Sequence, residues 1–214
     1  MTRSKRFENA LRYASRLHAT QTRKGSHTPY IGHLLAVAAI VIEHGASEDE
    51  AIAALLHDAV EDQGGKPTLR RIRGRYGKRV ARIVNGCTDT DEMPKPPWCR
   101  RKKDFIAGLH DASPSVQLVV AADKLHNARA VLADLRVDRD SVWSNFTTGR
   151  DGTLWYYRSV TNVLLEATGS DEPRLARLTP SSTVPFPPSS RRVAVRRRRA
   201  SAINRRRREP IPDA

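Results

Sequence analysis

The feature that most restricts the fold and chemistry of this chain is the segment HDAVED at residues 57–62. It follows an uninterrupted apolar stretch at residues 51–56, within a helical pattern that begins near Glu48. In one continuous helix, residues four apart share a face, so His57 would lie above Glu61 and Asp58 above Asp62. An imidazole and three carboxylates so close together favour a bound divalent cation. The alternative is an acidic, solvated helix end, and the rest of the sequence has to decide between the two.

Helical patterns cover most of the chain up to residue 168, and no stretch has the alternating pattern that is typical of a strand. Ser47 and Glu50 have the spacing of a capping box, and Pro29 and Pro114 suit the first turn of a helix. We therefore predict an all-α fold, a bundle of about eight to nine helices. The predicted helices cover residues 5–20, 30–44, 48–62, 68–76, 78–87, 98–112, 113–135 and 152–168.

The C-terminal part of the sequence differs in composition from the rest. Residues 170–214 hold 12 Lys and Arg against 4 Asp and Glu, so they contribute +8 to the net charge of +15. Proline- and serine-rich stretches at residues 179–182 and 185–190 precede arginine runs at residues 196–199 and 205–208. This composition predicts a disordered, cationic tail at residues 170–214, after one domain at residues 1–169.

Cysteine usage and hydropathy indicate where such a protein works. The two cysteines, Cys87 and Cys99, offer no disulfide framework and fit a reducing compartment. The first residues lack the pattern of a secretory signal, and the longest apolar stretch, residues 34–42, is too short to cross a bilayer. We expect a cytoplasmic protein without a membrane partner.

Two further residues have the character of metal ligands. His33 lies in an otherwise apolar helical pattern, where a lone histidine is more often a core residue than a ligand. Asp123 follows an apolar run, and a buried carboxylate must be paired or bound to a metal. Asn127, four residues later, shares the face of Asp123.

These motifs together resemble the HD-domain phosphohydrolases. His33, the pair His57-Asp58 and Asp123 correspond to the H…HD…D metal set of that family. The HDxxED segment is similar to the hydrolase domain of RelA/SpoT-type alarmone enzymes, as are RKG at residues 23–25, PYIGH at residues 29–33 and DKLHNAR at residues 123–129. Residues 97–102 and GTLWYYR at residues 152–158 are similar to stretches of the small single-domain bacterial hydrolases. As a small single-domain alarmone hydrolase, the chain is also similar to the metazoan SpoT homologue. The resemblance covers about residues 5–168.

The resemblance implies an activity and a site. Its members remove the 3′-pyrophosphate of (p)ppGpp, giving GDP or GTP plus pyrophosphate, and usually use Mn²⁺; this chain would be a hydrolase without a synthetase. The implied substrate contacts are Arg23, Lys24, Lys102, Asn127 and Tyr156, with Trp155 or Tyr157 as alternatives for the last. The remaining histidines, His18, His27, His44, His110 and His126, are taken as structural or exposed.

The chemistry is consistent with that site. Two imidazoles and two carboxylates, from His33, His57, Asp58 and Asp123, form a nitrogen and oxygen donor set without thiolate, which suits one Mn²⁺, Fe²⁺ or Zn²⁺. Such an ion polarises a phosphoryl oxygen and lowers the pKa of a water molecule. Glu61 and Asp62 would orient that water and accept its proton.

Three alternatives remain open from the sequence. One is another nucleotide phosphohydrolase on the same scaffold, an NADPH 2′-phosphatase or a hydrolase of adenosine alarmones. A second is a nucleic-acid-associated protein, with weak, non-specific contact through the arginine-rich tail. A third is a degenerate HD domain that serves only in interactions, which the complete ligand set argues against. In the first alternative the partner is a small-molecule nucleotide, and in the second it is a polyanion. The sequence leaves the oligomeric state open.

Overall fold

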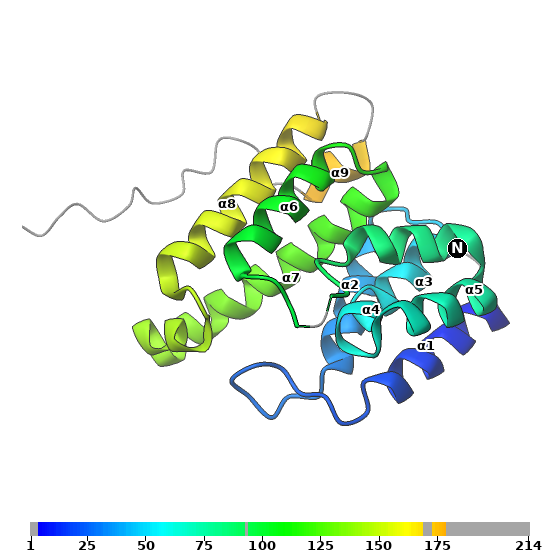
Figure 1. Ribbon diagram of the computed structural model, residues 1–214, viewed down its shortest axis with the longest axis horizontal. Coiled ribbons are helices and arrows are strands. Elements are labelled where there is room, and N and C mark those ends of the chain that lie inside the picture. Colours follow the sequence, from blue (N-terminus) through cyan, green and yellow to red (C-terminus); the bar gives the residue numbers. More distant parts are fainter. Residues whose placement is uncertain (1–3, 93, 169–172, 179–214) are drawn as a thin grey trace, which may run out of the picture. The chain divides into compact units, whose positions relative to one another are not determined.

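The computed structural model describes residues 4–92, 94–168 and 173–178 (Figure 1). In these residues the elements are α1 (Lys5–Leu17), α2 (Ile31–Glu43), α3 (Glu48–Leu56), α4 (Ala59–Asp62), α5 (Gly65–Cys87), α6 (Trp98–His110), α7 (Pro114–Asp138), the 3₁₀ helix η1 (Arg139–Asn145), α8 (Gly149–Thr168) and α9 (Pro173–Leu178). The β-pairing found among them is an isolated bridge between Thr22 and Pro29. The predicted all-α fold is confirmed.

Helix α3 lies at the centre of the core. It packs against α1, α2, α5 and α7, and every residue from 51 to 56 is fully buried. A helix that is enclosed on all sides has no polar face, which explains the uninterrupted apolar run in the sequence. Its start is fixed by the predicted capping box, in which Ser47 Oγ accepts from the backbone N–H of Glu50 and the Glu50 carboxylate accepts from the N–H of Ser47.

The prediction of one continuous helix through residue 62 is wrong at His57 and Asp58. Helix α3 ends at Leu56, and α4 starts at Ala59. The ring Nδ1 of His57 lies 2.8 Å from the carbonyl oxygen of Ala54, the oxygen to which the N–H of Asp58 would donate in an unbroken helix. A side chain therefore takes the place of a backbone donor, and the helix restarts when the N–H of Asp62 donates to the carbonyl of Asp58.

The segment after α4 follows the sequence prediction more closely. Helical structure continues from residue 65 to residue 87, and Gly77 interrupts it with φ 91° and ψ 172°, a backbone conformation that favours glycine. This matches the two short helices expected on either side of Gly77.

Two elements were not predicted. The 3₁₀ helix η1 follows α7, and α9 lies beyond residue 169, where no helix was expected. Leu175 and Leu178 of α9 are buried, and α9 packs against α7 and α8. The prediction that residues 170–214 form no regular structure is therefore wrong for Pro173–Leu178, while the arginine runs lie outside the described residues. Among the helices described, none is long and apolar enough to span a membrane.

Candidate metal centre

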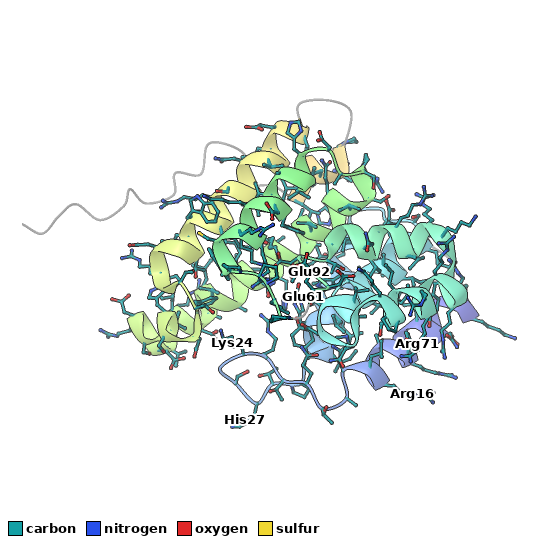
Figure 2. All side chains as sticks on the ribbon, viewed as in Figure 1. Arg16, Lys24, His27, Glu61, Arg71 and Glu92 are labelled. Carbon is teal, nitrogen blue, oxygen red and sulfur yellow. The ribbon has the colours of Figure 1, made fainter. Side chains whose placement is uncertain are left out.

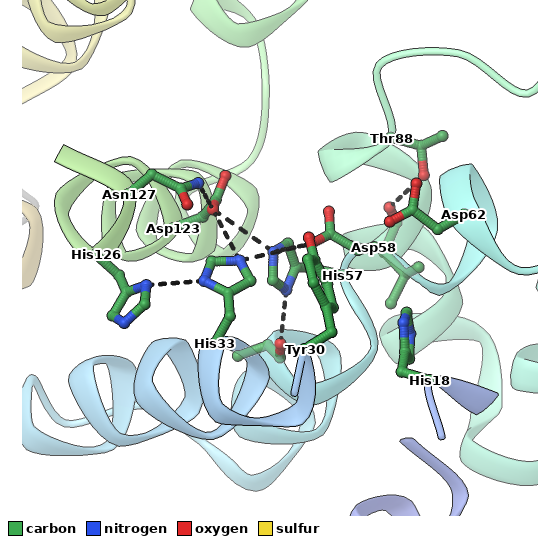
Figure 3. Close-up of polar contacts among 12 residues, drawn as sticks. His18, Tyr30, His33, His57, Asp58, Asp62, Thr88, Asp123, His126 and Asn127 are labelled. Carbon is green, nitrogen blue, oxygen red and sulfur yellow. Dashed lines mark hydrogen bonds and ion pairs between the residues drawn. The ribbon is translucent and has the colours of Figure 1, made fainter. Parts of the chain in front are cut away.

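Four side chains from three packed parts of the chain converge on one point (Figure 3). His33 comes from α2, His57 and Asp58 from the junction of α3 and α4, and Asp123 from α7. Helices α2, α3 and α7 contact one another, and His33, His57 and Asp123 are buried. The fold thus brings together the four predicted metal ligands.

The donor atoms lie at distances that suit ligands of one ion. His57 Nε2 is 3.0 Å from Asp58 Oδ2, and His33 Nε2 is 3.3 Å from Asp123 Oδ1. The crossed pairs, His33 with Asp58 and His57 with Asp123, are 3.5 and 3.7 Å apart. Because metal–ligand distances are about 2.0–2.2 Å, neighbouring ligand atoms are separated by roughly 3 Å or slightly more.

The two imidazoles show that a divalent ion fits this cluster. Nε2 of His33 and Nε2 of His57 are both buried and lack a hydrogen-bond partner among the described residues. An unsatisfied buried polar group costs about 1–3 kcal/mol, so two of them facing the same carboxylates are unfavourable without a further group. A divalent cation bound between these nitrogens and the oxygens of Asp58 and Asp123 would satisfy all of them.

Each histidine is held by a contact at its other ring nitrogen. His57 Nδ1 donates to the Ala54 carbonyl at 2.8 Å, which leaves the lone pair on Nε2. His33 Nδ1 lies 2.8 Å from His126 Nδ1. For Nε2 of neutral His33 to be free as a ligand, Nδ1 must carry the proton and donate it to His126. Such partners orient metal-binding imidazoles, so His126 does more than the structural or exposed role expected from the sequence.

The two carboxylates are held in the same way. The hydroxyl of Tyr30 donates to Asp58 Oδ2 at 2.6 Å. Lys124 Nζ donates to Asp123 Oδ2 at 2.6 Å, and Asn127 Nδ2 donates to Asp123 Oδ1. Lys124 binds Oδ2, so Oδ1 stays directed toward the cluster. Oδ1 is also the oxygen that faces the imidazoles.

The charges in the cluster favour ionised carboxylates. Burial alone would raise the pKa of Asp58, but His57 and His33 outweigh it and hold this pKa well below its ordinary value. The pKa of Asp123 is also well below its ordinary value, because Lys124 and the two histidines outweigh the effect of burial. Burial, with the nearby His33 and Arg23, lowers the pKa of His126 to about 4, so His126 is neutral at neutral pH and can accept a proton from His33 in a hydrogen bond.

Glu61 and Asp62 of α4 lie apart from the imidazole contacts. Glu61 Oε1 is 2.9 Å from Lys95 Nζ, and Asp62 Oδ2 accepts a hydrogen bond from Gln21 Nε2 at 2.8 Å (Figures 2 and 3 show the two acids). Burial and the neighbouring Asp58 raise the pKa of Asp62 above its ordinary value. A carboxylate with a raised pKa is a better proton acceptor at neutral pH.

Gln21 is a site residue that the sequence interpretation missed. Its Oε1 accepts from Gln63 Nε2 and from His18 Nδ1, each at 2.7 Å, while its Nε2 donates to Asp62. An amide oxygen can only accept hydrogen bonds, so Gln63 and His18 must both be donors. These contacts fix one orientation of the Gln21 amide. The sequence gives no local signal of this contact, since Gln21 and Asp62 are brought together only by the fold.

Two of the predicted substrate contacts, Arg23 and Asn127, meet near the cluster. Arg23 Nη2 donates to Asn127 Oδ1 at 2.8 Å, and the Arg23 guanidinium lies 5.9 Å from the centre of the Tyr30 ring. Lys24 is exposed on the loop between α1 and α2 and makes no ion pair or hydrogen bond with described residues (Figure 2). The structure therefore groups Arg23 with the cluster, whereas Lys24 has no side-chain contact with the cluster.

Lys102 and Tyr156, two further predicted substrate contacts, lie against each other. Tyr156 is buried, and its ring centre lies 4.7 Å from Lys102 Nζ and 5.5 Å from Lys124 Nζ. Lys102 Nζ also donates to Asp89 Oδ2 at 2.6 Å. Tyr156 thus connects Lys102 to Lys124, the partner of a predicted metal ligand. The rings of Tyr156 and Trp155 both contact Trp98.

Lys95 is a second residue that was missed. It lies between α5 and α6, where no helix was predicted, and its ammonium contacts Glu61. A lysine beside prolines in a polar loop belongs to no sequence motif, so only its ion pair with Glu61 identifies Lys95 as a site residue.

Comparison with known proteins agrees with this geometry. The HD domain family model matches residues 10–154, more than half of the 214 residues. The chain is 38% identical over 120 residues to the human guanosine-3′,5′-bis(diphosphate) 3′-pyrophosphohydrolase MESH1; the match covers 55% of this chain and 64% of the human protein. The chain therefore spans slightly less than two thirds of that relative.

Solved structures with a similar fold include a metazoan ortholog of SpoT described as hydrolyzing ppGpp, with a TM-score of 0.65 and 26% identity, covering 83% of this chain and 96% of that one. A protein from Listeria monocytogenes EGD-e has a TM-score of 0.58 and 32% identity, covering 69% of this chain and 96% of that one. The family match, the helical fold and the convergence of His33, His57 and Asp58 show that the chain belongs to the HD domain family.

Proposed function

We propose that this protein hydrolyses the 3′-pyrophosphate of guanosine 3′-polyphosphates, converting (p)ppGpp to GDP or GTP plus pyrophosphate. The observation that carries the proposal is the pair of buried, unpartnered imidazole nitrogens of His33 and His57, which face two ionised carboxylates, with Glu61 and Asp62 in the helix that follows. The names of the human and metazoan relatives support the choice of substrate.

His33, His57, Asp58 and Asp123 would hold one divalent ion. Their nitrogen and oxygen donors suit Mn²⁺, with Fe²⁺ or Zn²⁺ as alternatives, and contain no thiolate. When bound, the ion supplies Lewis-acid polarisation of a phosphoryl oxygen and a lowered pKa for water.

Asp62 accepts the proton from the attacking water in this proposal. Its Oδ2 accepts from the Gln21 amide, and Oδ1, which has no side-chain hydrogen bond among the described residues, would take the proton. Glu61 orients the water after its carboxylate is released from Lys95. Lys95 is then free to contact a substrate phosphate, because a polyanion competes with Glu61 for the same ammonium.

The rest of the substrate would be bound by cationic side chains, one side-chain amide and one aromatic ring. Arg23 and Lys24 would lie along the nucleoside and its phosphates, and Asn127 near the ribose. Lys102 would reach a phosphate after exchange from Asp89, and Tyr156 would line the same pocket. A substrate with four or five phosphates requires several cations. The hydrogen bond of Arg23 to Asn127, and the contact of Lys102 with the Tyr156 ring that Lys124 also contacts, support this assignment.

A substrate panel tests the proposal. Purified, Mn²⁺-loaded protein is assayed with ppGpp, pppGpp, ppApp, NADPH and GMP, and the products are identified. We expect GDP or GTP and pyrophosphate from the first two at the highest kcat/KM. Preference for ppApp or NADPH would move the protein to an adenosine alarmone hydrolase or an NADPH phosphatase, and no turnover of any of them would reject a phosphohydrolase.

The cellular location of this reaction is also a proposal. We place it in the cytoplasm, because Cys87 and Cys99 are both free thiols. The weak contact with nucleic acid expected through residues 170–214 falls mainly on residues outside the described part.

A further inference from the structure

Asp89 is a buried carboxylate that binds two cations through one of its oxygens. It lies between α5 and α6, and its side chain is 5% exposed. Its Oδ2 accepts from Arg101 Nη1 and, at 2.6 Å, from Lys102 Nζ. Its Oδ1 is also buried and has no hydrogen-bond partner among the described residues. Two cations therefore share one oxygen of this carboxylate, while the other oxygen is unused.

The two cations differ in the other contacts that hold them. Arg101 Nε donates to the carbonyl oxygen of Pro96 at 3.1 Å, so the guanidinium is fixed at a second nitrogen. Lys102 has no side-chain hydrogen bond to a described residue other than the one to Asp89, and its ammonium lies 4.7 Å from the centre of the Tyr156 ring. Arg101 is thus the fixed partner of Asp89, and Lys102 is the partner that is able to leave.

Lys102 also lies near the candidate metal centre. Its helix, α6, packs beside α8, which supplies Tyr156 (Figure 1). The Tyr156 ring contacts both Lys102 and Lys124, and Lys124 donates to Asp123. Lys102 and the partner of a proposed metal ligand therefore contact the same ring.

Movement of Lys102 to a substrate phosphate would leave Asp89 with one cation. Loss of a partner from a buried charge is costly when nothing replaces that partner. The unused Oδ1 provides the replacement, because an arginine binds both oxygens of a carboxylate through two parallel N–H groups, whereas a lysine is a point charge. Arg101, which binds Asp89 through Nη1 alone, gains a second hydrogen bond at Oδ1 once the ammonium has left.

We propose that Arg101 is a positioning residue, which keeps Asp89 paired while Lys102 moves from Asp89 to a phosphate of the nucleotide. In the free protein Asp89 holds Lys102 beside Tyr156. In the complex Arg101 binds both oxygens of Asp89, and Lys102 binds the phosphate. The exchange makes and breaks only hydrogen bonds and ion pairs. It rests on the proposed function, because a nucleotide polyphosphate is the ligand that draws Lys102 away.

Replacement of Arg101 in the full-length protein tests the proposal. R101Q leaves Lys102 as the one cation on Asp89, so movement of Lys102 would strand a buried carboxylate. We expect KM for ppGpp to rise by about 10–100-fold, the effect of an unmade hydrogen bond to a charged group, and kcat to stay within about threefold of wild type. R101K keeps the charge but cannot bind both oxygens, so its KM should stay at least about fivefold above wild type.

R100Q is the matched control. It removes the same charge from the same helix, at a side chain that is 76% exposed and pairs with the equally accessible Asp104. Its KM should stay within about twofold of wild type. A KM increase in R100Q equal to that in R101Q would assign the effect to net charge and overturn the proposal.

The D89N background separates a role through Asp89 from direct contact with the substrate. An asparagine carries no charge to strand, so D89N/R101Q should have the KM of D89N to within about twofold. A KM increase as large as in R101Q alone would show that Arg101 binds the phosphate itself, and would overturn the proposal. A wild-type KM in R101Q or in R101K would overturn it as well. If R101Q fails to fold, as judged by its Tm, the comparison of R101K with wild type decides.

Calorimetric binding of the nucleotides in the substrate panel separates this inference from the proposed function. Failure of wild type to hydrolyse ppGpp would reject the proposed function. The variants are then compared by the Kd of the nucleotide that wild type binds most tightly. A Kd for R101Q that is raised by about 10–100-fold supports the role of Arg101, and an equal Kd overturns it. If wild type binds none of the nucleotides, both proposals are overturned.

Discussion

Replacement of Glu61 by Gln separates the proposed chemistry from metal binding and from stability. The substitution keeps the size and shape of the side chain and removes its charge. Its main contact is the ion pair with Lys95, in which the side chains are 22% and 37% exposed. A pair this accessible contributes at most about 1 kcal/mol, so Tm should fall by no more than about 2–4 °C.

The expected loss of turnover is much larger. Removing the carboxylate that holds the attacking water for proton transfer to Asp62 should lower kcat by roughly 10²–10⁴-fold, which is about 2.7–5.4 kcal/mol of transition-state stabilisation. KM should change far less, and toward tighter binding, because the ion pair that Lys95 would have to leave to meet the substrate is worth at most about 1 kcal/mol. Metal content should match wild type, since Glu61 contacts none of the four proposed ligands.

The assay measures bound metal, kcat and KM on the same preparation, with Glu92→Gln as the matched control. Glu92 is exposed, lies near Glu61 in the view of Figure 2, and has no side-chain partner among the described residues, so its replacement removes the same charge without touching the proposed chemistry. Near-normal kcat in Glu61→Gln would refute the catalytic role and leave Glu61 as an acidic helix residue. Loss of metal in parallel with activity would make Glu61 a ligand.

Three further results are expected. Asp58→Ala should reduce bound metal from roughly one ion per chain to near zero and abolish hydrolysis, as measured by metal analysis and product formation; full activity in excess chelator would contradict the site. Gln21→Leu should lower kcat by about 10–100-fold at unchanged metal content, because the hydrogen bond that orients the Asp62 carboxylate, worth about 1.5–3 kcal/mol, is lost, and this outweighs the higher pKa that the same loss gives Asp62; unchanged kcat would show that this contact is only structural. Glu50→Gln should destabilise the protein at pH 7 by about 1.5–3 kcal/mol. Burial alone raises the pKa of Glu50, but hydrogen bonds and the ion pair with Arg174 lower it overall, so its contribution is present above its unfolded pKa of about 4.3 and is lost as the pH falls through the folded value. Thermal unfolding at pH 7 and at lower pH should show wild type losing more stability than Glu50→Gln on acidification; parallel losses would contradict this.

The sequence predicted the helical core well because its signals are local. The capping residues Ser47 and Glu50 and the break at Gly77 depend on neighbouring residues in the chain, and each lies where it was expected. The break between α3 and α4 was not predictable in this way. It depends on the side chain of His57 taking the carbonyl of Ala54, and neither proline nor glycine marks the position.

The ligands themselves follow from sequence motifs, whereas their supporting contacts do not. His126 lies within a recognised motif, yet its contact with His33 joins residues 93 positions apart and arises only when α2 and α7 pack. Gln21 and Lys95 meet the acids of α4 for the same reason. Helix α9 was missed because it is short and has only two buried leucines, Leu175 and Leu178, too few to produce a helical pattern.

The spacing of the four proposed ligands along the chain couples metal supply to the lifetime of the protein. His33 and Asp123 are separated by most of the folded chain, so the unfolded protein offers no comparable site. An ion that binds only the native state stabilises it by mass action, by about 4.1 kcal/mol at a free concentration 1,000 times Kd. Under metal starvation the protein would therefore unfold more often and be degraded by proteases faster, so its abundance would fall together with its activity.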